Sequence, residues 1–241
     1  MLYLLITNNL VAQETLKIVY FYNFAPFSWK EDQPLQGIMI DILNEVLVKE
    51  MKIPVSHKAY PWKRAQELVK TNEADGFVTV ATPDRRTYTI VGSEPVVSVK
   101  WLMYVKANDP IIEQLKTVTS INDLKGYRFG SYLGNGWAKR NLSGMKINYW
   151  ADKLDNTFKM LVNDRFSIYV SMPQVAHYYL KKLGLTDKIT ELPYVLDADS
   201  MVLCIRKNSP YIHILPKFDA TLKKLRKSGR IQPILEKYLN L

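Results

Sequence analysis

The chain has 241 residues, of which 47% are hydrophobic and 23% charged. This composition is typical of a globular protein with a sizeable core and excludes a disordered chain. The formal net charge of +10 could attract anionic solutes, nucleic acid or a membrane surface. The sequence contains neither a nucleic-acid reader pattern nor an apolar run of the ~20 residues that a membrane span needs. We therefore expect no nucleic-acid partner and no integral membrane receptor.

Residues 1–12 have the composition of the end of a secretory signal peptide. Apolar runs cover residues 2–6 and 10–12, and cleavage is expected near Ala12 or Gln13. The segment lacks a basic n-region and is shorter than usual, so it could also be the N-terminal strand or tail of a cytosolic protein. We expect a short or remnant signal peptide, and hence export.

Strand and helix patterns alternate along the first hundred residues. Apolar runs predict strands at residues 16–20, at residues 53–58 and around Phe77, and helical spacing predicts a helix through residues 40–51. Pro61 suits the first turn of another helix, which would begin near Trp62. The alternation favours an α/β fold.

A candidate anion site follows the Phe77 strand. Thr82 can cap a helix whose first turn holds Pro83 and Asp84, with Arg85 immediately behind. Backbone N–H groups at a helix start, together with a guanidinium that can bind two oxygens at once, suit a carboxylate. Arg86 could take the place of Arg85, and a surface salt bridge is the structural alternative.

The second half of the chain repeats the order of the first. Residues 68–83 and 161–173 both run from a helix end through an asparagine-containing turn and a strand to a proline-led helix. After residue 217, basic and apolar residues alternate at the spacing of two amphipathic helices. The repeat suggests two similar lobes.

Five groups of motifs follow one another along the chain. They are the strand at 16–19; Ala25-Pro26-Phe27; Gly37-Ile38-Met39-Ile40-Asp41; Tyr60-Pro61-Trp62-Lys63-Arg64-Ala65 with Ala74-Asp75-Gly76-Phe77-Val78-Thr79-Val80 and Ala81-Thr82-Pro83-Asp84-Arg85; and Leu124-Lys125-Gly126-Tyr127-Arg128-Phe129-Gly130. In this order, over residues 16–239, they resemble the extracellular solute-binding proteins of the polar amino-acid uptake family. The resemblance implies a two-lobed α/β clamp of the type II periplasmic-binding-protein class. Such proteins bind a small solute and deliver it to an ABC permease in the inner membrane.

The resemblance also implies how the chain divides. Lobe one would comprise residues 13–103 and 204–241, and lobe two residues 104–203. The chain would cross between them near residues 100–105 and 199–205. We expect a periplasmic monomer that holds no cofactor and no metal.

Site residues follow from the same resemblance. Arg85 matches the arginine that binds the ligand carboxylate, Trp62 and Phe24 match aromatic residues at the ligand, and the closing loop matches Asn135, Gly136 and Trp137. The family has hydroxyl residues just before the arginine, where this chain has Val78 and Val80. Thr79 and Thr82 are left to provide hydroxyl contacts. Each residue could instead be ordinary core or turn.

Ser171 is the clearest departure from the family. Amino-acid binders of the family have an aspartate at this strand end, which pairs with the α-ammonium of the ligand. Without it, unless Asp197 or Asp199 substitutes, an α-amino acid loses a charge-assisted hydrogen bond of roughly 1.5–3 kcal/mol. A carboxylated solute that is bound without recognition of an α-ammonium group is therefore an alternative to an amino acid as the predicted ligand.

Alternatives to transport are a sensory module and an enzyme, since a few relatives on this fold are dehydratases or lyases. The histidines, His57, His177 and His213, are scattered, and no nucleophile elbow or phosphate loop is present. The single cysteine, Cys204, lies in an apolar strand pattern and reads as a buried small hydrophobe. We expect a binding protein and not an enzyme.

Overall fold

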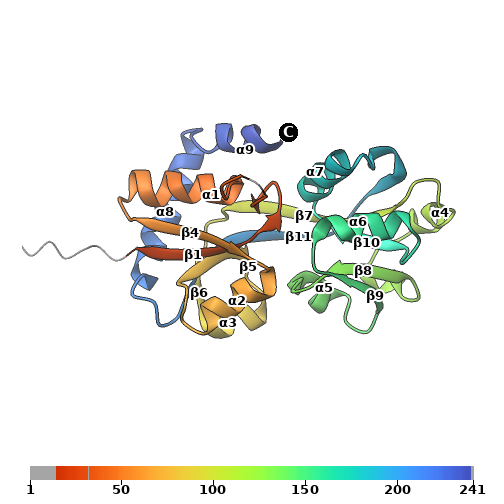
Figure 1. Ribbon diagram of the computed structural model, residues 1–241, viewed down its shortest axis with the longest axis horizontal. Coiled ribbons are helices and arrows are strands. Elements are labelled where there is room, and N and C mark those ends of the chain that lie inside the picture. The colour runs from red at the N-terminus through yellow and green to blue at the C-terminus, as the bar shows by residue number, and fades with distance from the viewer. Residues whose placement is uncertain (1–14, 32, 240–241) are drawn as a thin grey trace, which may run out of the picture.

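Two groups of strands and helices are joined by a pair of long strands (Figure 1). The computed structural model describes residues 15–31 and 33–239, so the predicted signal peptide at 1–12 lies outside the described residues. The long strands are β7 (Val97–Lys106) and β11 (Ile189–Arg206), which pair antiparallel from Ile189 opposite Lys106 to Met201 opposite Val97. Register shifts interrupt this pairing between Leu192 and Asp197.

Lobe one contains a largely parallel sheet covered by helices. Its strands are β1 (Leu16–Phe21), β4 (Val55–Tyr60), β5 (Gly76–Val80) and β6 (Thr89–Val91), with a small hairpin of β2 (Asn23–Phe24) and β3 (Ser28–Trp29). Its helices are α1 (Ile38–Leu43), which continues as the π-helical η1 (Asn44–Glu50), and α2 (Trp62–Lys70), α3 (Pro83–Tyr88), α8 (Leu215–Lys227) and α9 (Gln232–Leu239), with the short 3-10 turn η4 (Ile212–Ile214) before α8.

Lobe two has the same plan. Its strands are β8 (Arg128–Tyr132), β9 (Lys146–Ala151) and β10 (Ile168–Ser171). Its helices are α4 (Ile111–Leu115), α5 (Gly136–Asn141), α6 (Leu154–Val162) and α7 (Pro173–Leu183), with the 3-10 turns η2 (Ile121–Leu124) and η3 (Thr186–Lys188).

The order of the strands makes the internal repeat visible. It is β4-β1-β5-β11-β7-β10-β8-β9. Each end holds three parallel strands, and the fourth strand, β11 or β7, is antiparallel. The carboxyl ends of β1, β5, β8 and β10 all face the junction between the lobes (Figure 1), which is where α/β sheets bind ligands.

The predicted elements are present, with shifted boundaries. The second strand begins at Val55, because Ile53 and Pro54 still belong to the turn in which Ile53 N–H donates to Leu47 O. The helix predicted through residues 40–51 changes to π-helix at Asn44. Cys204 is fully buried in β11, as predicted. The lobe limits 13–103 with 204–241, and 104–203, stay a prediction.

Candidate functional site

A cavity lies between the lobes, and the space in it that no atom fills is about 490 Å³, part of which is open to solvent. Both lobes contribute to its wall, mainly at strand ends and helix starts. The lining residues are Tyr20, Phe21, Phe24, Ser28, Met39, Trp62, Val78, Thr79, Val80, Arg85, Trp101, Tyr132, Asn135, Gly136, Trp137, Met172 and Met201.

Seven of the nine predicted site residues are brought together here. Phe24, Trp62, Thr79 and Arg85 come from lobe one, and Asn135, Gly136 and Trp137 come from lobe two. The structure does not bring Thr82 or Ser171 into the lining. Contact of any of the nine with a ligand stays a prediction.

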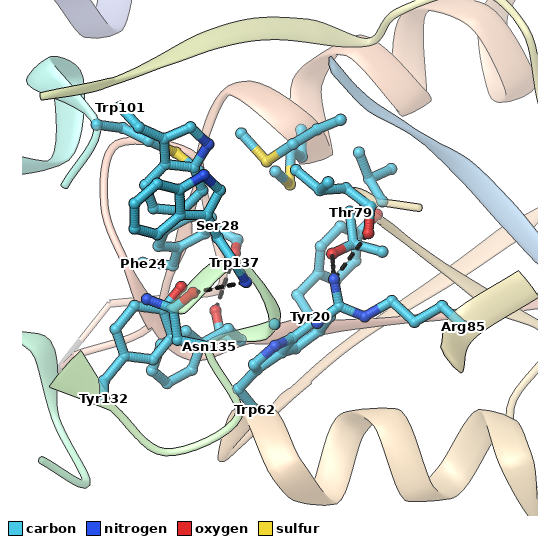
Figure 2. Close-up of a pocket in the computed structure, with 17 residues that line it drawn as sticks. Tyr20, Phe24, Ser28, Trp62, Thr79, Arg85, Trp101, Tyr132, Asn135 and Trp137 are labelled. Carbon is cyan, nitrogen blue, oxygen red and sulfur yellow. Dashed lines mark hydrogen bonds between the residues drawn. The ribbon is translucent and has the colours of Figure 1, made fainter. Parts of the chain in front are cut away.

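Arg85 is held by lobe one. Thr82 caps α3, since its side chain accepts the N–H of Arg85 at 3.4 Å, and Pro83 occupies the first turn. Guanidinium atom Nη1 donates to Thr79 Oγ1 at 2.9 Å and to Val80 O at 2.7 Å, and Nε donates to Gln66 Oε1 at 3.1 Å. The guanidinium also lies over the Trp62 ring, 5.1 Å from its centroid (Figure 2). These contacts fix its orientation.

No carboxylate of the described residues forms an ion pair with Arg85. Three charged side chains are buried within the described residues, and both Glu45 and Asp75 have ion pairs there. Arg85, only 4% exposed, has none, and Nη2 makes no hydrogen bond to any described residue. Burial accordingly lowers the pKa of the Arg85 guanidinium from its usual value. A buried, unpaired cation is costly, so an anion in the cavity would be strongly favoured.

Aromatic rings and methionines make up most of the remaining wall. Trp101 and Trp137 stack with centroids 4.8 Å apart, and Phe21 stacks with Tyr132 at 5.7 Å. Figure 2 shows the two indoles on one side of the cavity and the Arg85 guanidinium on the other. The cavity therefore has a cationic end and an apolar end.

Two aspartates of β11 hold the indoles from behind. Trp137 Nε1 donates to Asp197 at 2.7 Å and Trp101 Nε1 donates to Asp199 at 3.2 Å. Arg140 of α5 lies 3.7 Å from Asp197 and 3.3 Å from Asp199. Burial first, and then repulsion from Asp197, raise the pKa of Asp199. Neither carboxylate lines the cavity, so neither substitutes for the aspartate missing at Ser171.

The loop before α5 closes lobe two over Arg85. Asn135 caps the helix, because its Oδ1 accepts the N–H groups of Trp137 and Ala138, while its Nδ2 donates to Ser131. A Cβ atom on Gly136 would lie 3.0 Å from Thr82 Cγ2 and 3.2 Å from Arg85 Nη2. The glycine lets the lobe-two backbone approach the guanidinium closely.

Ser171 is buried at the end of β10, opposite Leu102 of β7. Its neighbour Met172 faces the cavity instead. Among the described residues, no aspartate or glutamate lines the cavity, and no group of three histidine, cysteine, aspartate or glutamate side chains could hold a metal.

Sequence reasoning missed several lining residues. Trp101, Met201 and Tyr20 lie in apolar strands that are buried on both faces, where nothing in the pattern marks the residue at the cavity. Tyr132 could have been found, because an aromatic residue at the end of a parallel strand, just before the Asn135 loop, occupies a typical ligand position.

The sequence pattern of the bacterial extracellular solute-binding proteins, family 3, matches residues 16–241. Among individual proteins, the chain is 26% identical over 221 residues to the probable amino-acid-binding protein YxeM of Bacillus subtilis (strain 168), covering 89% of this chain and 80% of YxeM.

Solved structures share the fold at low sequence identity. A mutant of ArgBP from T. maritima superposes with a TM-score of 0.78 at 17% identity, covering 94% of this chain and 96% of ArgBP. A histidine kinase sensor domain with similarity to periplasmic binding proteins gives a TM-score of 0.78 at 14% identity, with the same coverage of 94% and 96%. These likenesses confirm the predicted two-lobed α/β fold. Within the described residues, no helix has the length and apolar character to cross a membrane.

Proposed function

Because the chain belongs to the bacterial extracellular solute-binding proteins, family 3, we propose that it captures a small carboxylate-bearing metabolite in the periplasm for an ABC permease. The ligand would lie in the cavity between the lobes, and the protein would act as a monomer that returns its ligand unchanged. Membership of the family and the likeness to YxeM support a binding role over catalysis.

The observation that carries this proposal is the buried Arg85 guanidinium, which has no ion-pair partner among the described residues. Three of its contacts go to neutral oxygens of lobe one, and Nη2 remains for a ligand. A ligand carboxylate would supply the missing negative charge and accept from Nη2 in a charge-assisted hydrogen bond. Such a bond contributes roughly 1.5–3 kcal/mol.

Thr79 and Trp62 would act through Arg85. Thr79 fixes Nη1, and the Trp62 ring covers one face of the guanidinium. Phe24, Trp137 and the backbone at Asn135 and Gly136 would surround the rest of the ligand. We propose no direct ligand contact for Thr82, which orients Arg85 as the cap of α3.

The proposal is tested by identifying what the protein binds. Mass spectrometry of material released from purified, denatured protein should find a small carboxylate, which should then raise the melting temperature of ligand-free protein. Arg85→Ala should abolish that rise. Arg86→Ala is the matched control, because Arg86 is exposed and its side chain donates to Ala81 O, away from the cavity lining. A rise that persists in Arg85→Ala contradicts the proposal.

The compound recovered from the protein also distinguishes binding for transport from the alternative functions. An enzyme on this fold would convert the recovered compound, which chromatography after incubation would reveal. A sensory module would bind it but would not support uptake when paired with a permease in reconstituted vesicles.

A further inference from the structure

We propose that the cavity selects a flat, apolar carboxylate, such as an aromatic acid, that carries no ammonium group. This inference rests on the proposed function and specifies its ligand class. It is carried by three features of the wall: its charge, its free polar atoms and the arrangement of its rings.

The charge of the wall is positive only. Arg85 is the one charged side chain that lines the cavity within the described residues, and Asp197 and Asp199 are turned to the indole N–H groups and Arg140. An α-ammonium group would enter beside an uncompensated guanidinium and find no carboxylate partner. Desolvating it there is unfavourable.

The polar side chains of the wall are largely occupied. Thr79 accepts from Arg85, Asn135 caps α5, and Ser28 donates to Phe21 O. The polar side-chain atoms of the wall for which no hydrogen bond to a described residue is found are Arg85 Nη2, Trp62 Nε1 and the Tyr132 hydroxyl. The first two can only donate and the hydroxyl can also donate, so this set suits ligand oxygens better than ligand N–H groups.

The rings are arranged for a flat body and not as a cage around a cation. Trp101 lies nearly parallel to Trp137, at 17°, and Phe21 to Tyr132, at 26°. In each pair, the partner ring covers one face of each ring. A cage for a quaternary ammonium needs several ring faces directed at one point, whereas an aromatic body can stack on or insert beside such pairs. Met39, Met172 and Met201 add an adaptable apolar surface.

A matched set of probes tests the inference. L-Phenylalanine is 3-phenylpropanoate with an added α-ammonium, and 2-phenylethylamine lacks the carboxylate. Isothermal titration of ligand-free protein should show 3-phenylpropanoate binding at least tenfold more tightly than L-phenylalanine, with no binding of 2-phenylethylamine. Arg85→Ala should remove the binding of 3-phenylpropanoate, while Arg86→Ala should retain it.

A reciprocal variant tests the charge argument. Met172 precedes α7 at the cap position and faces the cavity, so Met172→Asp provides both a good helix cap and a carboxylate in the wall. We expect the ratio of 3-phenylpropanoate to L-phenylalanine affinity to fall at least tenfold. Circular dichroism checks that Met172→Asp folds. If it does not fold, the comparison of the two ligands in the unmodified protein still tests the inference.

Different results would contradict the inference and the proposed function. If an α-amino acid binds at least as tightly as 3-phenylpropanoate and needs Arg85, the inference is wrong while the proposed function stands. Glycine betaine binding more tightly than both would also overturn it, in favour of a cation cage. Failure of 3-phenylpropanoate to bind at millimolar concentration overturns the inference alone. Recovery of a ligand without a carboxylate, or binding of the recovered ligand that persists in Arg85→Ala, overturns the proposed function.

Discussion

At the scale of single residues, Gly136 of lobe two lies against Thr82 and Arg85 of lobe one. The hydrogen bonds of Arg85 and the cap of Thr82 hold both neighbouring groups in place. A Cβ atom at 3.0 Å from one and 3.2 Å from the other is tighter than ordinary van der Waals contact. Neither group can give way without losing a hydrogen bond.

Gly136→Ala should therefore weaken ligand binding without weakening the fold. Overpacking costs typically about 1–3 kcal/mol, which corresponds to a loss of affinity of about fivefold or more in the closed state. The melting temperature of ligand-free protein should stay the same or rise, because alanine restricts the unfolded chain more than glycine does. Titration calorimetry and thermal unfolding measure the two effects.

Lys139→Ala, on an exposed position of the same helix, is the control for this variant. It should leave the affinity for the recovered ligand unchanged. Full affinity in Gly136→Ala would mean that the loop does not approach Arg85 when ligand is bound.

Arg85 is the site residue that a local signature predicted, because it follows a cap and a proline. Trp62, Phe24 and the Asn135 loop were assigned to the site by the family resemblance, and local rules predicted only that a helix starts near Trp62. Trp101 of β7 and Met201 of β11 reach the same cavity through the pairing of the two strands, which no local pattern specifies. The positions of Asp197 and Asp199 behind the indoles depend on the same long-range pairing.

At the scale of elements, the C-terminal helices are tied back to lobe one. Arg230, which precedes α9, pairs with Glu45 and Glu50 of η1, and Lys237 and Tyr238 of α9 donate to Asp41 at 2.8 and 2.7 Å. The hydrogen bond from Lys49, and then that from Arg230, lower the pKa of Glu45. These ion pairs connect the C-terminal segment to α1 and η1, which lie far from it in sequence.

Glu45→Gln should lower the stability of the fold in a pH-dependent way. A carboxyl whose pKa is lower in the folded state stabilises the fold above its unfolded pKa of about 4.3, and this stabilisation is lost as the pH falls through the folded value. We expect a loss of about 1 kcal/mol at pH 7 that shrinks below about pH 4. Urea unfolding at several pH values measures it.

Glu113→Gln is the matched control, because the ion pair of Glu113 with Lys116 is exposed. It should change the free energy of unfolding by less than about 0.5 kcal/mol. A pH-independent loss in Glu45→Gln would show that the carboxyl matters through packing and not through its charge.

Periodicity predicted the existence of the elements better than their extent. The apolar run 201–205 was recognised as a strand, but β11 begins at Ile189 and includes Pro193 and several polar residues. Its extra length is provided by pairing with β7. Likewise, amphipathic spacing predicted α8 and α9, but it does not reveal the ion pairs of Arg230 with Glu45 and of Lys237 with Asp41.

At the scale of the whole molecule, the lobes make several direct contacts with each other. Phe21 stacks on Tyr132, Trp29 contacts Tyr178 with centroids 5.6 Å apart, and Leu154 N–H donates to Asn23 Oδ1 at 2.7 Å. Lys182 forms an ion pair with Glu31. The structure is thus that of a closed clamp.

Small-angle scattering should detect opening when the cavity is empty. Opening of the clamp in ligand-free protein would let water solvate the Arg85 guanidinium, which removes the cost of burying an unpaired charge. We therefore expect the open state to be favoured, with a radius of gyration larger than the value calculated from the closed structure. Saturation with the recovered ligand should reduce it to that value. Arg85→Ala, mixed with the same ligand, should show no reduction, and an unchanged profile in the unmodified protein despite proven binding would contradict a hinge.

The paired strands β7 and β11 have a consequence for the speed of capture. The two crossings are hydrogen-bonded neighbours, and their register shifts lie in one short stretch. We therefore expect the lobes to rotate about that ribbon and not to diffuse apart as on a flexible linker. Trp137 and Gly136 therefore stay at a high effective concentration around Arg85 even when the clamp is open. A ligand that first meets Arg85 alone is then enclosed in a unimolecular step, whose rate does not depend on the concentration of either protein or ligand.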